Sequence, residues 1–138
     1  MAETTPYFNV TIVTPAGTIE TYDVRHLRAS GSEGDFGILA NHLPFVTPLR
    51  IGDIELDTAK GKQYWAVVSG FVEVLANKVT ILAENAEPAD KIDVERAKAA
   101  RDRALSRLQS PPVDLDFERC RLALQRSLNR LKVSGYKT

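Results

Sequence analysis

The most constraining feature of this sequence is a change of both charge and hydrophobic period near Pro88. Residues 1–88 contain six basic and eleven acidic side chains, whereas residues 89–138 contain twelve basic and seven acidic ones. The two segments therefore carry formal charges of −5 and +5, although the whole chain is neutral. Apolar residues alternate as in strands before this point and recur as in helices after it. We expect two modules, over 1–88 and 89–138, which dock, undock and meet partners.

The first module is predicted to be an antiparallel β-sandwich or barrel. Gly70 predicts a bulge or a sharp bend, and Ala76-Asn77 predicts the centre of a tight hairpin. Many short strands with frequent turns are typical of sandwiches and barrels. The predicted strands are runs rich in Val, Ile, Thr, Tyr and Phe over 8–14, 18–24, 26–29, 43–51, 64–69, 71–75 and 78–82.

The segment over 31–42 stands apart within this module. Its three glycines surround two acidic residues, and it ends at His42. Glycines permit positive φ and a close approach of the backbone. Two interpretations stay open, a surface turn between strands and a contact loop on a rigid scaffold. The glycine spacing does not match a dinucleotide-binding fingerprint.

The second module is predicted to be an antiparallel pair of helices. Asp93 is a suitable N-cap for the first helix, which Pro111-Pro112 end. Asp114 and Asp116 offer caps for the second helix, and Ser134-Gly135 end it. The expected apolar stripes are Val94, Ala97, Ala104 and Leu108 in the first helix and Phe117, Cys120, Leu124, Leu128 and Leu131 in the second.

A pair of helices with so many alanines buries little surface by itself. Helices of roughly 15 residues are marginal in water, so the hairpin is expected to pack on the first module or on a partner. A permanently docked hairpin and a switchable one are both compatible with this pattern. The chain's only cysteine, Cys120, lies on the apolar stripe and is interpreted as a small core residue.

Arginines recur on one face of each predicted helix. Arg96 and Arg103 are seven residues apart, and Arg119, Arg126 and Arg130 follow at spacings of seven and four. An antiparallel hairpin brings Arg96 close to Arg126 and Arg130, where the like charges repel one another. A polyanion would relieve this repulsion. The alternative interpretation is a solvated arginine-rich face.

The phosphate chain of a nucleotide is a suitable ligand for such a cluster of arginines. The start of the first helix adds free N–H groups, and Glu87 and Asp93 supply acceptors for a base or a ribose.

The sequence shows no catalytic constellation. The segment 60–63 lacks the Ser or Thr and the first Gly of a phosphate loop. Two histidines and one cysteine, far apart in sequence, give no metal-ligand spacing.

Several blocks of this sequence, taken in order, resemble the epsilon subunit of the bacterial F-type ATP synthase over nearly the whole chain. One departure is Ala40, where the family usually has Pro or Gly. The blocks that carry the resemblance are 31–39, Asn41-His42, Pro44, 68–74, 79–83, Ile92-Asp93-x-x-Arg96-Ala97 and Asn129-Arg130-Leu131.

The resemblance implies an α+β fold, with a ten-stranded antiparallel β-sandwich over 1–88 and a two-helix hairpin over 89–138. It implies a non-catalytic central-stalk subunit of a proton-translocating rotary motor, peripheral to the bacterial cell membrane on its cytoplasmic side. The sandwich would bind the gamma subunit and the c-subunit ring, with the ring contacts at Asp35 and His42. The helices would fold on the sandwich or extend along gamma toward the alpha/beta hexamer, a form associated with inhibition of ATP hydrolysis.

The resemblance also implies a regulatory ATP site in the folded hairpin. In some family members the folded form binds ATP, without turning it over, through an Ile-Asp-x-x-Arg-Ala motif that is intact here. The sequence sets neither the affinity nor a magnesium requirement. The matching positions are Glu87, Ile92, Asp93, Arg96, Ala97, Arg103, Arg126 and Arg130.

Other functions fit the sequence less well. A free-standing ATP sensor with the same fold would bind ATP without gamma. A nucleic-acid module is disfavoured because acidic residues interrupt the basic helices and only Phe117 and Tyr136 are aromatic there. An autonomous ATPase is disfavoured because no phosphate loop or catalytic base is apparent.

Overall fold

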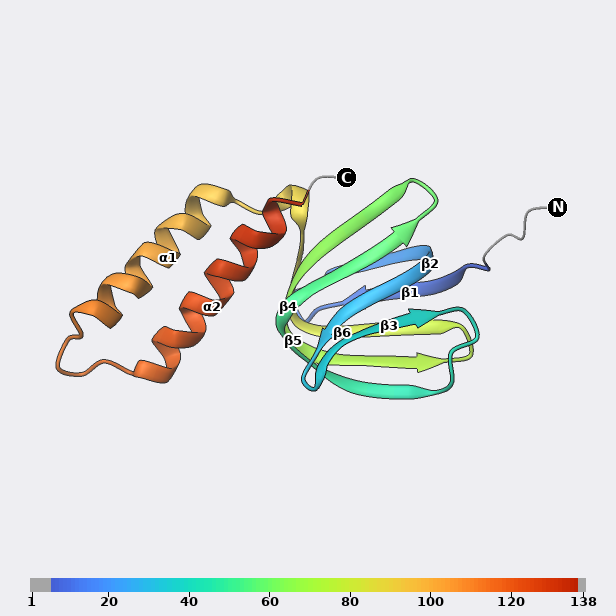
Figure 1. Cartoon of the computed structure of the whole chain (residues 1–138), viewed down its shortest axis with the longest axis horizontal. Coiled ribbons are helices and arrows are strands. Elements are labelled where there is room, and N and C mark those ends of the chain that lie inside the picture. Colours follow the sequence, from blue (N-terminus) through green and yellow to red (C-terminus); the bar gives the residue numbers. More distant parts are fainter. Residues whose placement is uncertain (1–5, 137–138) are drawn as a thin grey trace.

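A computed structural model describes residues 6–136 of the chain. The strands lie together at one end of the molecule and the two helices at the other (Figure 1). This arrangement confirms the prediction of a β-sandwich domain followed by two helices. The elements are β1 (Phe8–Val13), β2 (Ile19–Gly31), β3 (Gly34–Leu39), β4 (Phe45–Thr58), β5 (Gly61–Leu75), β6 (Lys78–Pro88), the 3-10 helix η1 (Ala89–Lys91), α1 (Val94–Gln109) and α2 (Phe117–Ser134).

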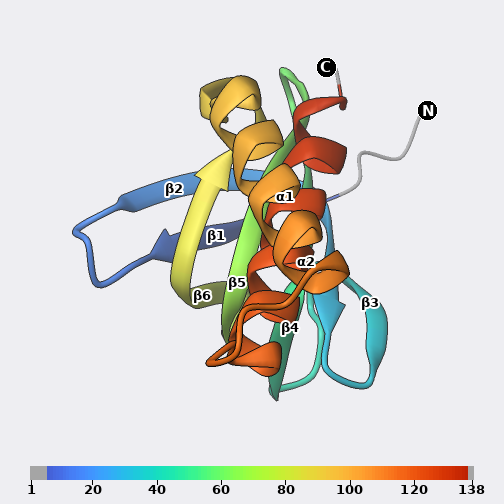
Figure 2. The same cartoon turned by 90° about the vertical axis from the view of Figure 1, so that its left-hand side faces the viewer.

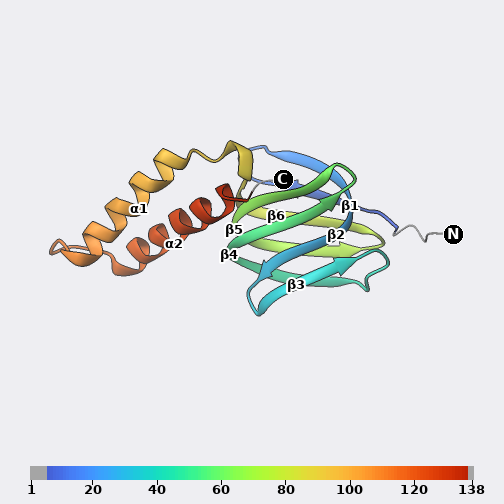
Figure 3. The same cartoon turned by 45° about the horizontal axis from the view of Figure 1, so that its top comes forward.

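The strands form a closed sheet with one attached edge strand. Their order is β1-β6-β5-β4-β2-β3, and β1 also pairs with β2 to close the barrel. Five of the six pairings are antiparallel, and β1 with β6 is parallel. Figure 3 shows β3 at the border of this sheet, beside β2. Closure leaves few free strand edges, so little of the sheet is open to pairing with another chain.

The structure has six strands in the described residues rather than the expected ten. Turn-type residues bend the long strands here instead of ending them. The predicted runs 18–24 and 26–29 belong to one strand, β2, which begins at Ile19 and whose register shifts between Val24 and His26. The predicted bend at Gly70 lies inside β5, where Ser69 and Gly70 have φ values of 37° and 137°. Bulges of this kind allow one strand to serve both layers of the barrel.

The segment 31–42 contains more regular structure than either interpretation of the sequence expected. Most of it is β3, which pairs with β2 in antiparallel fashion. At one end of this pairing Leu39 lies opposite His26, and at the other Gly34 lies opposite Gly31. A short connection over 40–44 then leads to β4. Within β3, only Ile38 is buried, so this strand presents most of its side chains to the surface.

The core of the barrel follows the alternation predicted from the sequence. In β1, Phe8, Val10 and Ile12 are buried and their neighbours are less so. Trp65 of β5 is buried among them and meets Tyr22 edge to face at a ring-centroid distance of 6.3 Å. Fully burying an apolar side chain contributes about 1.5–3 kcal/mol, so this core holds the barrel together.

Both helices begin at the predicted capping residues. The side chain of Asp93 accepts a hydrogen bond from the backbone N–H of Arg96 at 3.0 Å. Of the two candidate caps for α2, Asp116 is used, and it accepts from the N–H of Arg119 at 3.1 Å. Each cap satisfies one of the N–H groups that a helix start leaves without a partner.

Small residues form the contact between the helices. Ala97, Ala104 and Cys120 are buried there, and Cys120 Sγ donates to the carbonyl oxygen of Ala104 at 3.4 Å. The predicted stripe of α2 is wrong at two positions, because Phe117 and Leu128 are 59% and 47% exposed. Small residues make the contact between the helices, and other residues of α2 make the contact with the barrel. Phe117 and Leu128 belong to neither contact and stay exposed.

The hairpin touches the barrel through the C-terminal end of α2. Figure 2 looks onto the hairpin with α1 in front, and Figure 1 shows α2 between α1 and the strands. Val133 of α2 packs with Ile92 and Ala66 in a small buried cluster beside the main core. Neither helix has the length and apolarity needed to cross a membrane.

Candidate nucleotide site between the hairpin and the barrel

A cavity of about 440 Å³ lies where the hairpin meets the barrel. This volume is within the range of small-molecule sites, roughly 300–1,000 Å³. Strands β5 and β6 and both helices supply its walls. The lining residues are Ala66, Val68, Asn85 and Glu87 from the barrel, and Arg96, Ala100, Ala123, Arg126, Ser127, Asn129 and Arg130 from the hairpin.

The fold brings together four of the residues that the sequence selected. Glu87 lies one residue before the end of β6, Arg96 lies in the first turn of α1, and Arg126 and Arg130 are one turn apart on α2. They meet because the helices are antiparallel, so that the start of α1 lies beside the end of α2. Both of these ends face the barrel.

One part of the expected charge pattern is wrong. The sequence predicted three arginines that repel one another, but Arg130 is held by Glu87 in a two-point ion pair. Its Nε and Nη2 donate to the two carboxylate oxygens at 2.9 Å and 3.1 Å. Within residues 6–136, no carboxylate lies within ion-pair distance of Arg96 or Arg126. The uncompensated charge of the cavity therefore comes from these two arginines.

Arg103, the fourth predicted arginine, lines a neighbouring cavity instead. This cavity of about 620 Å³ lies between the helices and also contains Arg107 and Arg119. The two cavities share Ala100, Ala123 and Arg126. Arg126 thus lies at the boundary between them, and a ligand longer than one cavity would pass this side chain.

The other motif residues support the cavity rather than line it. Ile92 is buried against Val133 and Ala66, and Ala97 is fully buried between the helices. Asp93 caps α1 through the N–H of Arg96. This cap fixes the first turn of α1 and with it the backbone from which the Arg96 side chain starts.

Three polar residues of the site were missed in the sequence. Asn85, Ser127 and Asn129 line the cavity, and Asn129 Nδ2 donates to the carbonyl oxygen of Gly52 at 2.8 Å. Asn129 lies three residues after Arg126 on α2, so helical spacing was a signal for it. Asn85 lies two residues before Glu87 on β6, so strand alternation places both side chains on one face, but the predicted strand ended at residue 82 and this spacing was not recognised.

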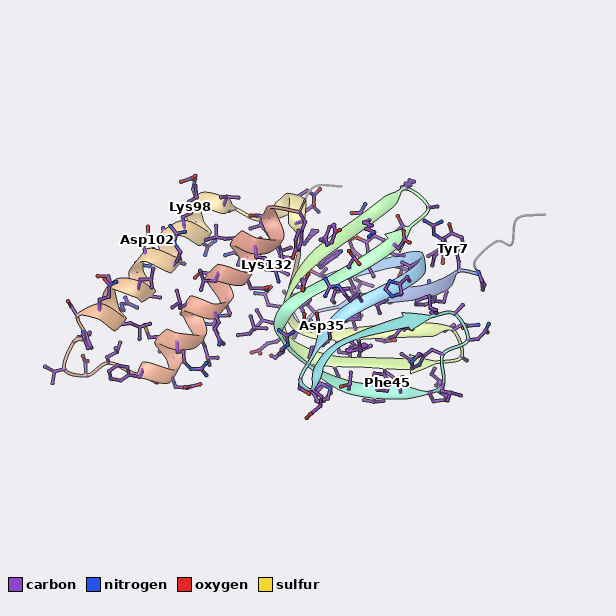
Figure 4. The ribbon with its side chains drawn as sticks, in the orientation of Figure 1. Tyr7, Asp35, Phe45, Lys98, Asp102 and Lys132 are labelled. Atoms are coloured by element: carbon purple, nitrogen blue, oxygen red, sulfur yellow. The ribbon has the colours of Figure 1, made fainter. Side chains whose placement is uncertain are left out.

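The two predicted ring contacts lie at opposite ends of β3. Asp35, near the start of the strand, accepts from Arg50 Nη2 at 2.6 Å and from Arg28 Nη1 at 3.4 Å. Asp35 also shares a polar cavity with Lys132 of α2, and Figure 4 shows it on the side of the barrel that faces the hairpin. His42 follows the other end of β3, where its ring lies 5.7 Å from that of Phe45.

A buried carboxylate stands beside Asp35. Asp53 is 4% exposed and accepts from Arg28 Nη2 at 2.6 Å and from Ser30 Oγ at 3.1 Å. Burial alone would raise the pKa of Asp53. The hydrogen bond and charge of Arg28, the Ser30 hydroxyl and the charge of Lys132 outweigh burial, and the pKa lies below its ordinary value. The positive charge of Lys132 on α2 therefore contributes to the lowered pKa of a carboxylate that is buried in the barrel.

The comparisons with known proteins cover both modules. Residues 7–89 match the family described as ATP synthase, Delta/Epsilon chain, beta-sandwich domain. Residues 90–135 match its long alpha-helix domain. The ATP synthase epsilon chain of Bacillus pumilus is 47% identical over 102 residues, which are 74% of this chain and 78% of that one. The epsilon chain of Bacillus subtilis is 49% identical over 105 residues, 76% and 80% of the two chains.

Solved structures show the same fold. A chain in the cryo-EM structure of the Euglena gracilis mitochondrial ATP synthase, OSCP/F1/c-ring, is similar with a TM-score of 0.76 and 25% identity. The match covers 92% of this chain and 80% of that chain. A chain from the Tetrahymena thermophila mitochondrial ATP synthase, central stalk/c-ring, has a TM-score of 0.54 and 16% identity and shows the fold alone.

The barrel and the basic hairpin define a small two-module protein with an arginine-lined cavity between the modules. The matches to both modules then give the family directly. The chain belongs to the delta/epsilon family of ATP synthase subunits, among the epsilon chains. As an epsilon chain it is a non-catalytic rotor subunit of the F-type ATP synthase.

Proposed function

We propose that the hairpin of this rotor subunit is a latch that ATP holds against the barrel. The observation that carries the proposal is the cavity at the junction, which Arg96 and Arg126 both line without an ion-pair partner in residues 6–136. Arginine binds phosphate oxygens through charge-assisted, often two-point hydrogen bonds. The phosphate chain of ATP supplies the negative charge that these two residues lack.

Glu87 and Arg130 have a different role in this proposal. Their ion pair joins β6 to α2 and forms one wall of the cavity. Glu87 keeps acceptor capacity for a ribose or base, and Arg130 stays positioned beside the phosphates. In this proposal ATP is bound as a regulatory ligand and is not turned over.

Few contacts hold the hairpin on the barrel, so a ligand can shift its position. Within residues 6–136 these contacts include the Glu87–Arg130 pair, the Asn129–Gly52 hydrogen bond and the small cluster around Val133, where the rings of Tyr64 and Tyr136 lie 4.6 Å apart. A ligand that binds only the docked form stabilises it by RT ln(1 + [L]/Kd), about 2.7 kcal/mol at one hundred times Kd. When ATP falls, the hairpin is free to extend along gamma. Its basic helices then meet acidic surfaces of the alpha/beta hexamer and inhibit ATP hydrolysis.

The barrel is proposed to join gamma to the ring of c subunits. The similar Euglena chain comes from a complex that contains a c-ring, which supports this assignment. Asp35 and His42 would make the ring contacts from the two ends of β3, along the exposed border of the sheet. The subunit would then be peripheral to the membrane, on the cytoplasmic side of the bacterial cell.

Calorimetric titration of the full chain with ATP, with and without magnesium, tests the nucleotide site. We expect saturable binding at one site. Arg126→Ala should weaken it by about tenfold or more, because a charged hydrogen bond contributes about 1.5–3 kcal/mol. Arg121→Ala is the matched control, since Arg121 pairs with Glu118 within α2 and lines neither cavity. Wild-type affinity in Arg126→Ala, or no binding at millimolar ATP, would contradict the proposal.

A further inference from the structure

Two asparagine side chains tie the connection after β3 to the β5–β6 hairpin. The backbone N–H of Asn41 donates to Oδ1 of Asn77 at 2.6 Å. In return, Nδ2 of Asn77 donates to Oδ1 of Asn41 at 3.1 Å. The backbone carbonyl of Asn77 also accepts from the N–H of Asn9 at 3.1 Å. Asn77 is therefore the point where three separate parts of the chain meet.

The backbone at both asparagines is in the left-handed region. Asn41 has a φ of 63° and Asn77 a φ of 61°. Asn77 forms a two-residue hairpin turn with Ala76, whose φ is 52°. Glycine is the usual residue at the second position of such a turn, because it adopts positive φ without strain. An asparagine there keeps the turn and adds an amide group, which here reaches the neighbouring connection.

The segment 40–44 depends on this amide pair. Among the side-chain and turn hydrogen bonds of residues 6–136, the two with Asn77 are the ones that join this segment to another element. The segment carries His42, whose Nδ1 lies 2.7 Å from the carbonyl oxygen of Leu43. Leu43 itself is 78% exposed. Without the amide pair, the chain ends at β3 and β4, the packing of Ala40 against the core and the contact of His42 with Phe45 would orient it.

The same end of the barrel carries further exposed apolar residues. Leu39 and Leu75 are each 56% exposed, and they flank the segment and the hairpin turn in sequence. In Figure 1 this end lies opposite the helical hairpin. A surface of this kind needs a fixed shape to meet a partner, because loops that must be ordered on binding lose affinity.

We infer that Asn77 is a positioning residue, which holds segment 40–44 and so presents His42 to the c-ring. The inference rests on the proposed ring contact at His42. Asn77 acts here through its amide and not as a contact of its own. A purely structural role of the amide pair would stabilise the barrel without affecting ring binding.

Three variants separate these roles. Asn77→Gly suits the positive φ and removes both amide hydrogen bonds. Asn77→Asp keeps an acceptor for the N–H of Asn41 and removes the donor. Ala76→Gly is the matched control, because it changes the same turn and leaves the amide pair in place. All three are made in the full chain.

Hydrogen exchange of the Asn41 amide, measured by NMR, tests the amide pair itself. We expect exchange about fivefold faster in Asn77→Gly, since one net hydrogen bond is lost at this amide. Asn77→Asp should retain most of the protection, and Ala76→Gly all of it. Wild-type exchange at Asn41 in Asn77→Gly would overturn the inference.

Binding of the chain to an epsilon-free rotor subcomplex of gamma and the c-ring tests the positioning role. We expect several-fold faster dissociation for His42→Ala and for Asn77→Gly, with recovery in Asn77→Asp and no change in Ala76→Gly. If His42→Ala weakens binding but Asn77→Gly does not, positioning by Asn77 is wrong and the ring contact stands. If His42→Ala binds like wild type, the ring contact fails, and with it the role assigned to Asn77.

Discussion

Glu87 at the end of β6 and Arg130 near the end of α2 form a two-point ion pair that joins the barrel to the hairpin. The Nε–Oε2 and Nη2–Oε1 distances are 2.9 Å and 3.1 Å, and both side chains are about three-quarters buried. This pair is the direct ionic link between the two modules in the part of the chain that the structure describes. It borders the proposed ATP site, so docking of the hairpin and the shape of the site depend on the same contact.

Glu87→Gln should loosen the hairpin. The variant removes the charge opposite Arg130 and is expected to weaken docking by about 1 kcal/mol, as is typical of a partly exposed ion pair. The measurement is amide hydrogen exchange along α2 in the absence of ATP, which should become faster. Glu118→Gln is the control, because the Glu118–Arg121 pair lies within α2 and does not cross to the barrel. Equal exchange in both variants would contradict the link.

Asp53 is expected to make the stability of the barrel fall at acidic pH. The pKa of Asp53 lies below its ordinary value of 3.8, so the carboxylate stabilises the fold above that pH. This stabilisation is lost as the pH falls through the lower, folded-state pKa. Urea unfolding followed between pH 7 and pH 2 should therefore show stability falling below about pH 4.

Asp53→Asn should remove that part of the pH dependence. At pH 7 it should cost about 1–3 kcal/mol, because Arg28 loses its closest charged acceptor. Asp57→Asn breaks the more exposed pair with Arg25 and should cost less than about 1 kcal/mol. An unchanged pH profile in Asp53→Asn would show that other carboxylates control the acid response.

The bend of β5 requires a glycine at position 70, because β6 leaves no room there for a side chain. A Cβ atom at this position would overlap the carbonyl oxygen of Leu82 and lie 2.8 Å from Cα of Ala83. Both atoms belong to the backbone of β6, which cannot move aside. Gly70→Ala should therefore cost more than about 4 kcal/mol or prevent folding.

Gly61→Ala is the matched control for the bend. Gly61 also has a positive φ, 117°, but a Cβ there meets no atom within 4 Å. Only backbone strain remains, about 1–2 kcal/mol. Urea unfolding monitored through the fluorescence of Trp65, the only tryptophan, compares the two variants. Similar stabilities for both would contradict the importance of the close approach.

Ala104 sets the distance between the helices. It is 3% exposed, and its carbonyl oxygen accepts from Cys120 Sγ. Ala104→Leu should overfill this contact and cost about 1–3 kcal/mol. Ala99→Leu, at an exposed position of the same helix, should leave stability almost unchanged. Thermal unfolding followed by circular dichroism at the helical band distinguishes the variants, and equal melting curves would show that the helices do not pack through Ala104.

Much of the fold could be predicted from local patterns. The alternation of Phe8, Val10 and Ile12 and the cap at Asp93 are short-range features, and both appear as expected. The expected count of ten strands came from the family resemblance, and local patterns could not correct it, because they do not show whether a bulge such as that predicted at Gly70 ends a strand or continues it. The exposure of Phe117 and Leu128 was unexpected for a related reason. Apolar spacing gives a helix face but not the partner that covers it.

The candidate site was predictable only in part. Helical spacing placed Arg126 and Arg130 on one face, and antiparallel pairing added Arg96. The ion pair between Arg130 and Glu87 depends on how the hairpin docks, which spacing does not determine. The buried carboxylate Asp53 was missed as well, because Asp53, Glu55 and Asp57 alternate with Ile54 and Leu56 in the sequence, a pattern that predicts exposed acids.

In the proposed latch, bound ATP holds the hairpin on the barrel. The most direct test of this latch is amide hydrogen exchange along α2 in the full chain as a function of ATP concentration. At ten times the Kd, exchange through undocking should slow about tenfold in the wild type and in Arg121→Ala, but not in Arg126→Ala. Exchange in α2 that stays the same while calorimetry shows the site to be saturated would contradict the latch.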